Sequence, residues 1–433
     1  MKQAFKIIDY TERYKSIMQF NKNKNIPIHR WYPFVEGYSK EFIQGILDEL
    51  DYTPECVLEP FSGSGTTSVE MQDKGIKCIS FEVSPFMHLL STVKLRRDYN
   101  DTAFLNFVQQ IQAELKEPIR NIRKIVPLPF GDTIVKNDKV NKWNFNDPVM
   151  NALLDIKNAI AKVNDKKYQE LFNIALASIL LDVSNVFRNG KCLSYKKDWS
   201  NKIRFKRKDV HTFFFEKLNT IFIDDIKTLT EDRNDKTDVN NYDLCYKGDV
   251  RENITKVNDN SIDLIITSPP YLNSRDYTDI YMLELKILGL VNSYDELRAL
   301  RNQTIRSHVQ VKYANLELLK INKLEEVVQQ IESNAGELWN NGLINMIKGY
   351  FIDMDYLFLQ FKRKMKSGKM AYVNVANSAY YGVEILVDEI ICEIAEKHGF
   401  TTIEIRKARD LKTSSQQSKQ IKSLRESVIV LKS

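Results

Sequence analysis

Hydrophobic and polar positions follow two different periods along this chain, and the changes of period mark its elements. Apolar residues at helical spacing over 41–50 precede the short apolar segment CVLEPF, which predicts a helix followed by a strand. After the small-residue stretch FSGSGTT, the segment 68–75 has a helical pattern that ends at a glycine, and IKCISFEV predicts a second strand. This region therefore predicts a strand, a glycine-rich loop, a helix and a strand.

A long helical region interrupts that pattern between about 99 and 240. Apolar residues recur at helical spacing over 102–124, 147–163, 166–187 and 211–231. A strand-like pattern resumes with LCYKGDV and SIDLIITSPPY. The second of these strands must end at Ser268, because a central strand does not accommodate the two prolines that follow. The helical region therefore predicts an insertion into a sheet-forming domain.

The carboxyl-terminal part returns to strands that alternate with helices. A helical pattern over 283–364 precedes the segment GKMAYVNVAN, which has the pattern of a strand. A helix is predicted over 384–400, with its end near Gly399, and TTIEIRKARD and ESVIVLKS predict two final strands. Such alternation is typical of a mostly parallel sheet with helices on both faces. The expected fold is α/β, a Rossmann-like doubly wound sheet with a large helical insertion.

The composition changes this picture little. The 433 residues are 43% hydrophobic and 28% charged, which suits one catalytic domain with a sizeable insertion. Five scattered cysteines form no C-x-x-C pair, so we expect neither a metal site nor redox chemistry. Because no secretory signal and no run of 18 apolar residues occur, we expect a cytoplasmic protein without a membrane partner.

The first candidate site is the loop with the sequence EPFSGSGTT, which begins at Glu59. Its glycines let the backbone turn tightly after a strand and approach a ligand closely. Glu82 lies at the end of the next strand, where its carboxylate can accept hydrogen bonds from two ribose hydroxyls. A lone G-x-G often marks an ordinary turn, but this context favours a nucleoside-binding site.

The second candidate site is Ser268-Pro269-Pro270-Tyr271, at the carboxyl edge of a parallel sheet, where open α/β proteins place their chemistry. The prolines are rigid and lack N–H donors, so a carbonyl and the Ser268 hydroxyl are available as acceptors. An aromatic amine needs such acceptors, because its lone pair is conjugated into the ring until the amine is drawn toward tetrahedral geometry. The ring of Tyr271 can stack on a base flipped out of a duplex.

Both motifs resemble those of one family. VLEPFSGSGTT resembles the S-adenosylmethionine-binding motif of the amino-methyltransferases, with Glu59 where the family has aspartate. SPPY resembles the catalytic motif of the DNA amino-methyltransferases, in which serine is more typical of cytosine-N4 enzymes and aspartate of adenine-N6 enzymes. An isolated P-P-Y is more often a rigid strand end, but the two motifs together favour this family and its class I methyltransferase fold.

The resemblance implies S-adenosylmethionine as the cofactor and assigns it a set of contacts. Phe61, Gly63 and Gly65 would wrap the methionine part, Glu82 would hold the ribose, and Asp249 would contact the adenine amino group. The segment 29–34 resembles the part that closes over the cofactor. The full set of expected cofactor-binding residues is Glu59, Pro60, Phe61, Gly63, Gly65, Thr66, Glu82 and Asp249.

A basic run with interleaved aromatic residues spans 188–208, inside the helical region. Such a stripe suits contacts with phosphates and bases, although charge runs alone are usually solvated faces. The motif order makes 99–240 the first candidate for target recognition and 286–345 the second. The candidate DNA-binding residues are Lys196, Lys197, Arg204 and Lys206.

These expectations divide the chain into a cofactor-binding part at 1–98, the helical insertion at 99–240, and a catalytic part at 241–433. The expected function is methylation of cytosine N4 in double-stranded DNA, within a restriction-modification or defence system that includes a cognate restriction endonuclease. Adenine N6 is the alternative target. An RNA or protein-amide methyltransferase and a catalytically silent nucleic-acid-binding module are more remote. Methylation of cytosine carbon 5 is disfavoured, because its Pro-Cys nucleophile is missing from the sequence.

Overall fold

The computed structural model describes residues 5–34, 37–190, 192–200, 204–231, 239–272, 276–313, 316–334, 342–413 and 421–433. Within them, a main sheet has the strand order β1, β11, β12, β8, β7, β2, β3, β6. Its strands are β1 (Ile7–Asp9), β2 (Cys56–Glu59), β3 (Lys77–Glu82), β6 (Cys245–Lys247), β7 (Ile262–Thr267), β8 (Met365–Ala376), β11 (Thr401–Lys412) and β12 (Ser423–Lys432).

The five strands from β6 to β8 run parallel to one another, and β12 is antiparallel to both of its neighbours, β8 and β11. β3 and β6 extend the sheet on one side of β2, and β7 and β8 extend it on the other side. The chain order therefore reverses between β2 and β7, which is the switch point where doubly wound sheets bind ligands. The mostly parallel, doubly wound α/β sheet expected from the sequence is confirmed.

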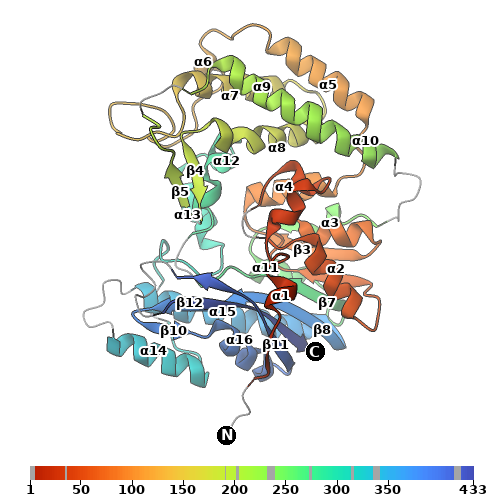
Figure 1. Cartoon of the computed structure of the whole chain (residues 1–433), viewed down its shortest axis with the longest axis vertical. Coiled ribbons are helices and arrows are strands. Elements are labelled where there is room, and N and C mark those ends of the chain that lie inside the picture. Colours follow the sequence, from red (N-terminus) through yellow and green to blue (C-terminus); the bar gives the residue numbers. More distant parts are fainter. Residues whose placement is uncertain are drawn as a thin grey trace.

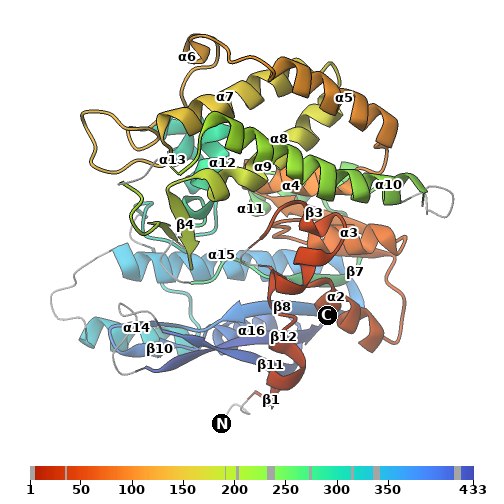
Figure 2. The same cartoon turned by 45° about the horizontal axis from the view of Figure 1, so that its top comes forward.

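Helices cover both faces of the sheet, as the alternation of buried strand residues requires. Val57 and Leu264 pack on one face, and Leu58 and Ile265 pack on the other, where α15 lies along the sheet (Figure 2). The helices of this part are α1 (Thr11–Tyr14), α2 (Lys40–Glu49), α3 (Thr66–Asp73), α4 (Pro85–Leu95), α11 (Val250–Asn253), α14 (Asn322–Asn334), α15 (Gly342–Lys364) and α16 (Val387–Lys397). Short 3-10 turns occur at Phe20–Asn25, His29–Trp31, Tyr242–Leu244, Ile254–Lys256 and Asp279–Tyr281.

A separate helical lobe sits above the sheet in Figure 1 and has its own apolar core. Residues 280–300, the pair Trp31 and Tyr32, and the apolar side chains of α4 also belong to this core, although they lie outside the insertion in sequence. The elements of the lobe are α5 (Asp101–Glu114), α6 (Ile122–Ile125), α7 (Asp147–Ala161), α8 (Lys166–Val183), β4 (Val186–Asn189), β5 (Cys192–Tyr195), α9 (Arg207–Lys217), a π-helical turn (Leu218–Phe222), α10 (Ile223–Glu231), α12 (Met282–Ile287) and α13 (Tyr294–Asn302).

Several predicted helices are shorter than expected. The helix predicted over 102–124 is interrupted at Pro118, which a helix interior does not tolerate. The one predicted over 166–187 ends at Val183, because Val186–Asn189 pairs with β5 in a hairpin. In its described residues, the stretch 283–364 contains α12, α13, α14 and α15, separated by non-helical segments. A small hairpin of β9 (Ser378–Tyr380) and β10 (Val383–Ile385) also follows β8.

Two classes of feature are absent from the part of the chain that the structure describes. None of its helices combines the length and apolarity that a membrane crossing requires. Its His, Cys, Asp and Glu side chains form no group of three or more that could hold a metal ion.

Candidate active site

A cavity of about 350 Å³ opens at the carboxyl ends of the central strands, at the switch point of the sheet. Its volume falls in the range of small-molecule sites. The sequence motifs that line it are Pro60, Phe61, Gly63, Thr66, Glu82, Ser268, Pro269, Pro270 and Tyr271. The structure thus brings both predicted sites, which lie about two hundred residues apart, to one cavity.

The glycine loop turns sharply between β2 and α3. Gly63 and Gly65 have φ values of 51° and 79°, in the left-handed region that favours glycine. A Cβ atom at Gly63 would lie 2.9 Å from the ring of Phe34, and one at Gly65 would lie 2.9 Å from Ser91 Oγ. The loop therefore requires glycine at both positions, and Gly65 forms the N-cap of α3 ahead of Thr66.

Glu82 lines the cavity next to the glycine loop. Its Oε2 accepts a hydrogen bond from the Gly63 N–H at 2.7 Å, and its Oε1 accepts one from the Ser84 N–H at 2.7 Å. Burial raises the pKa of Glu82 to about 7, against the lowering effect of these two donors. The carboxylate thus lies beside the turn, where sequence reasoning expected a ribose.

Glu59 has a different environment from Glu82. Its Oε1 accepts hydrogen bonds from the Phe61 N–H at 3.0 Å and the Thr267 hydroxyl at 2.7 Å, and its Oε2 accepts from Tyr38 and Thr67. The side chain is buried and is not among those that line the cavity. Glu59 therefore ties the glycine loop to Thr267, the residue just before the S-P-P-Y motif.

Lys94 is a buried cation that sequence reasoning missed. Its Nζ donates to the Ser64 carbonyl at 3.0 Å, and burial lowers the pKa of Lys94 to about 7. Ser91, one helical turn earlier, donates to the Gly63 carbonyl at 2.9 Å. Helix α4 therefore holds the outer side of the glycine loop through two side chains. Nothing in the local sequence distinguishes this lysine from a surface one.

The S-P-P-Y motif follows β7 and is fixed by a polar network. Tyr271 donates from its hydroxyl to Glu426 Oε1 at 2.5 Å, and its backbone N–H donates to the Tyr277 hydroxyl at 2.9 Å. Asn374 Nδ2 donates to Ser268 Oγ at 3.3 Å and to the Tyr271 hydroxyl at 2.7 Å. The tyrosine lines the cavity with its orientation set by these bonds.

Asn374, Arg409 and Glu426 are among the cavity-lining residues that were not found from the sequence. Asn374 is a polar residue within the buried strand sequence AYVNVA, a signal that could have marked it at the carboxyl end of β8. Arg409 and Glu426 form an ion pair directly across the β11–β12 ladder. Their position next to the motif depends on strand register, which no local pattern reveals.

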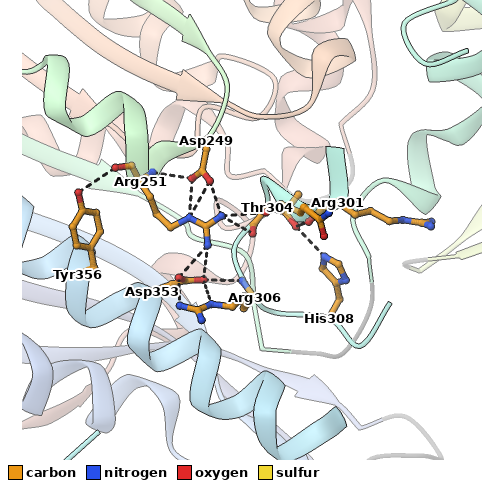
Figure 3. A network of polar contacts seen from close by, with 9 residues as sticks. Asp249, Arg251, Arg301, Thr304, Arg306, His308, Asp353 and Tyr356 are labelled. Atoms are coloured by element: carbon orange, nitrogen blue, oxygen red, sulfur yellow. Dashed lines mark hydrogen bonds and ion pairs between the residues drawn. The ribbon is translucent and has the colours of Figure 1, made fainter. Parts of the chain in front are cut away.

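Asp249 caps the short helix α11 and is held by Arg251 (Figure 3). The guanidinium of Arg251 lies between Asp249 and Asp353, and Asp353 also pairs with Arg306. Gly248 and Val250 line the cavity, whereas the carboxylate of Asp249 accepts from Arg251. Arg251 also donates to the carbonyl of Thr304, so this network positions a loop on the cavity wall.

The segment 29–34 joins the two lobes. Trp31 stacks on Phe222, and Arg30 pairs with Asp225 at 2.6 Å. Tyr32 donates to Glu284, which also pairs with Arg188 at 2.8 Å. Phe34, at its end, stacks on Tyr281 and lines the cavity beside Gly63.

The four predicted DNA-binding residues fall into two groups. Lys196 Nζ donates to the carbonyls of Leu181, Asp182 and Ser184, so it caps the end of α8. Lys197, Arg204 and Lys206 are exposed, and we call these three the basic triad. Lys191 and Lys202, which belong to the same basic run, lie outside the described residues.

Comparison with known proteins finds relatives over nearly the whole chain. The type II methyltransferase M.BsoBI of Geobacillus stearothermophilus is 28% identical over 96% of this chain and 87% of its own. M.AvaI of Nostoc sp. is 27% identical over 90% of this chain and 83% of its own. M.MvaI of Kocuria varians is 22% identical over 87% and 83%. No family model matches the chain.

The fold and these relatives define the class of the protein. Its mostly parallel sheet, with β12 inserted antiparallel between β8 and β11, is the α/β fold of a class I methyltransferase. The relatives are type II methyltransferases, and they support a methyltransferase family for this chain.

Proposed function

We propose that the protein is a site-specific DNA methyltransferase that transfers a methyl group from S-adenosylmethionine to the exocyclic N4 of cytosine. The observation that carries this proposal is the shared cavity, which the glycine loop and Ser268–Tyr271 line together. The names of the type II relatives support DNA as the substrate and a restriction-modification system as the setting. A cognate restriction endonuclease is the further partner in such a system.

The cavity suits S-adenosylmethionine. Gly63 and Gly65 leave no side chain over the turn, and the Glu82 carboxylate is placed to accept hydrogen bonds from ribose hydroxyls. Pro60, Phe61 and Thr66 complete the wall on the side of the loop. The cofactor supplies a methyl group that its sulfonium has already activated. Glu59 serves the same site indirectly, by holding Phe61 and Thr267, and Asp249 does so through the turn that it caps.

The S-P-P-Y motif suits an amine of a flipped base. A serine hydroxyl oxygen has two lone pairs, and Asn374 Nδ2 donates to Ser268 Oγ, so one acceptor position is left for an amine N–H. Pro269 and Pro270 keep the backbone rigid beside it, and Tyr271 presents its ring to the cavity. Serine at the first position is the feature that favours cytosine N4 over adenine N6.

The helical lobe is the proposed DNA-binding part, with target recognition within 99–240 and a second candidate at 286–345. The basic triad supplies exposed charge for backbone phosphates. Residues 1–98 would then carry the cofactor and 241–433 the catalytic motif. The core of the lobe contains residues from α12 and α13, so this second candidate region begins within the same packed unit.

The test is transfer of tritium from labelled S-adenosylmethionine to genomic DNA, with RNA and total protein as parallel substrates. We expect label in DNA, and the variant Pro269→Ala is expected to abolish it while cofactor binding persists. Label in RNA or protein alone would refute the proposal, and so would full transfer by Pro269→Ala, because the motif would then have no part in the reaction.

A further inference from the structure

Arg409 is a cavity-lining cation that uses only part of its side chain within the protein. It lies on β11, its side chain is 23% exposed, and its Nε donates to Glu426 Oε2. Among the described residues, its two terminal nitrogens have no hydrogen-bond or ion-pair partner. A guanidinium has five N–H donors, so the edge formed by these two nitrogens is available to a ligand of the cavity.

Glu426 fixes the position of Arg409 relative to the S-P-P-Y motif. The carboxylate is buried, with its side chain 2% exposed, and its Oε1 accepts a hydrogen bond from the Tyr271 hydroxyl at 2.5 Å. One carboxylate therefore joins the guanidinium to the ring on which the target base would stack. Because an oriented guanidinium loses less conformational freedom when it binds, this arrangement suits a planar, bidentate contact.

The place of Arg409 in the sheet separates it from the proposed cofactor site. The sheet runs β2, β7, β8, β12, β11 on this side, so the strand of Arg409 lies four strands from the one that precedes the glycine loop. With about 4.8 Å between neighbouring strands, this separation is roughly 19 Å. The carboxylate of S-adenosylmethionine belongs to its methionine part, which the proposed function places at that loop. An arginine side chain does not bridge this distance, so the ligand of Arg409 is a different anion.

A flipped nucleotide brings its own anions to the cavity. Flipping rotates the nucleotide about its backbone, so the phosphates on either side of the target sugar move with it. With the amine at Ser268 and the base on Tyr271, the sugar and phosphates lie at the mouth of the cavity. Arg409 both lines the cavity and is exposed to solvent, which places it at this mouth. Its free edge matches two oxygens of a phosphate.

We propose that the terminal nitrogens of Arg409 bind a backbone phosphate of the flipped target nucleotide. This inference rests on the proposed function. Glu426 is then a positioning residue, which holds the guanidinium and the Tyr271 ring in a fixed relation. The basic triad does not line the cavity, whereas Arg409 meets a phosphate that arrives there with the flipped base.

The test uses DNA in which one phosphate is replaced by an uncharged methylphosphonate. Each duplex contains the sequence at which the wild-type protein labels genomic DNA, and it is unmodified or carries the replacement just before or just after the target nucleotide. Binding is measured by fluorescence anisotropy in the presence of sinefungin, an unreactive analogue of the cofactor. We expect one of the two replacements to weaken binding by the wild-type protein about tenfold, as loss of a charged hydrogen-bonded contact gives.

Arg409→Gln is expected to bind the unmodified duplex about tenfold more weakly than wild type and to lose the response to that replacement. Arg425→Gln is the matched control. Arg425 also pairs with a buried carboxylate, that of Asp388, and its side chain is 19% exposed, but it does not line the cavity. This control is expected to respond to the methylphosphonate as wild type does.

Three results would overturn the inference. Wild-type binding that ignores both replacements, in DNA that the protein labels, would do so and leave the proposed function standing. A full response in Arg409→Gln would also do so, because a variant that only disturbed Glu426 or the fold would bind more weakly and still sense the lost charge. Weaker sinefungin binding by Arg409→Gln without DNA would place the guanidinium on the cofactor. If wild type labels no DNA at all, the proposed function fails and this inference falls with it.

Discussion

The replacement Glu59→Gln tests how the structure joins the glycine loop to the catalytic motif. Phe61 N–H and the Thr267 hydroxyl donate to one carboxylate oxygen, and the hydroxyls of Tyr38 and Thr67 donate to the other. Glutamine keeps an oxygen for Phe61, whose N–H cannot be reversed, and turns its nitrogen toward the two hydroxyls, which can rotate to accept. The variant should therefore fold, with only a weakening of these hydrogen bonds.

The effect of this replacement on the free energy of unfolding depends on pH, because burial raises the pKa of Glu59 from 4.5 to about 7. Between these values the folded protein holds a proton that the unfolded chain has lost, so this residue's contribution to the free energy of unfolding falls as the pH rises through that window. At 1.36 kcal/mol per pKa unit, the fall between pH 5 and pH 8 is about 2–3 kcal/mol. Glutamine does not titrate, so the variant lacks this change.

The assay is urea denaturation of the wild-type protein and Glu59→Gln at pH 5, 6, 7 and 8. The stability advantage of the wild-type protein over the variant should shrink by about 2–3 kcal/mol from pH 5 to pH 8. Glu55→Gln is the control, because the side chain of Glu55 is 87% exposed, and its difference from wild type should not change. A difference for Glu59→Gln that is independent of pH would contradict a raised pKa of Glu59 in the folded protein.

Three further predictions concern the cavity and the DNA-binding lobe. Gly63→Val, at φ 51° and with Phe34 only 2.9 Å from its Cβ, should weaken sinefungin binding by at least about tenfold in calorimetry, and unchanged affinity would remove the loop from the cofactor site. Because the pKa of Glu82 is about 7, its protonation should weaken sinefungin binding by about tenfold per pH unit below that value, and Glu82→Gln should lack this dependence. Glutamine at all three positions of the basic triad should make the logarithmic salt dependence of DNA binding shallower by about 3, and an unchanged slope would exclude the triad from the interface. Lys196 is left intact in that variant, because it caps α8.

Much of the fold follows from local pattern. The strands and the helix around the glycine loop have clear periods and end at glycines or prolines, so they form close to where the sequence predicts them. The β4–β5 hairpin was not predicted, because Val186–Asn189 continues the apolar pattern of α8 and becomes a strand only by pairing with β5. The joint between the lobes was also not predictable, since Tyr32, Arg188 and Glu284 meet only in the folded chain.

Some residues of the candidate site could likewise be predicted from local sequence patterns, and others could not. Ser268 and Gly63 could be found because each follows a strand, and the carboxyl ends of parallel strands meet at one edge. Asn374 and Glu426 escaped notice because they meet diagonally across the β8–β12 ladder, where Asn374 pairs with Val428 and Glu426 with Ala376. No sequence pattern marks Lys94 as a site residue, because its burial depends on the packing of α4 against the glycine loop.

The proposed function is methylation of the amine of cytosine in DNA, at the cavity that the S-P-P-Y motif lines. The direct measurement is digestion of tritium-labelled product DNA to nucleosides, followed by chromatographic identification of the labelled one. We expect all of the label to elute with N4-methyldeoxycytidine and Tyr271→Ala to yield none. Label in N6-methyldeoxyadenosine would contradict the choice of target, and label in 5-methyldeoxycytidine would contradict the chemistry assigned to the cavity.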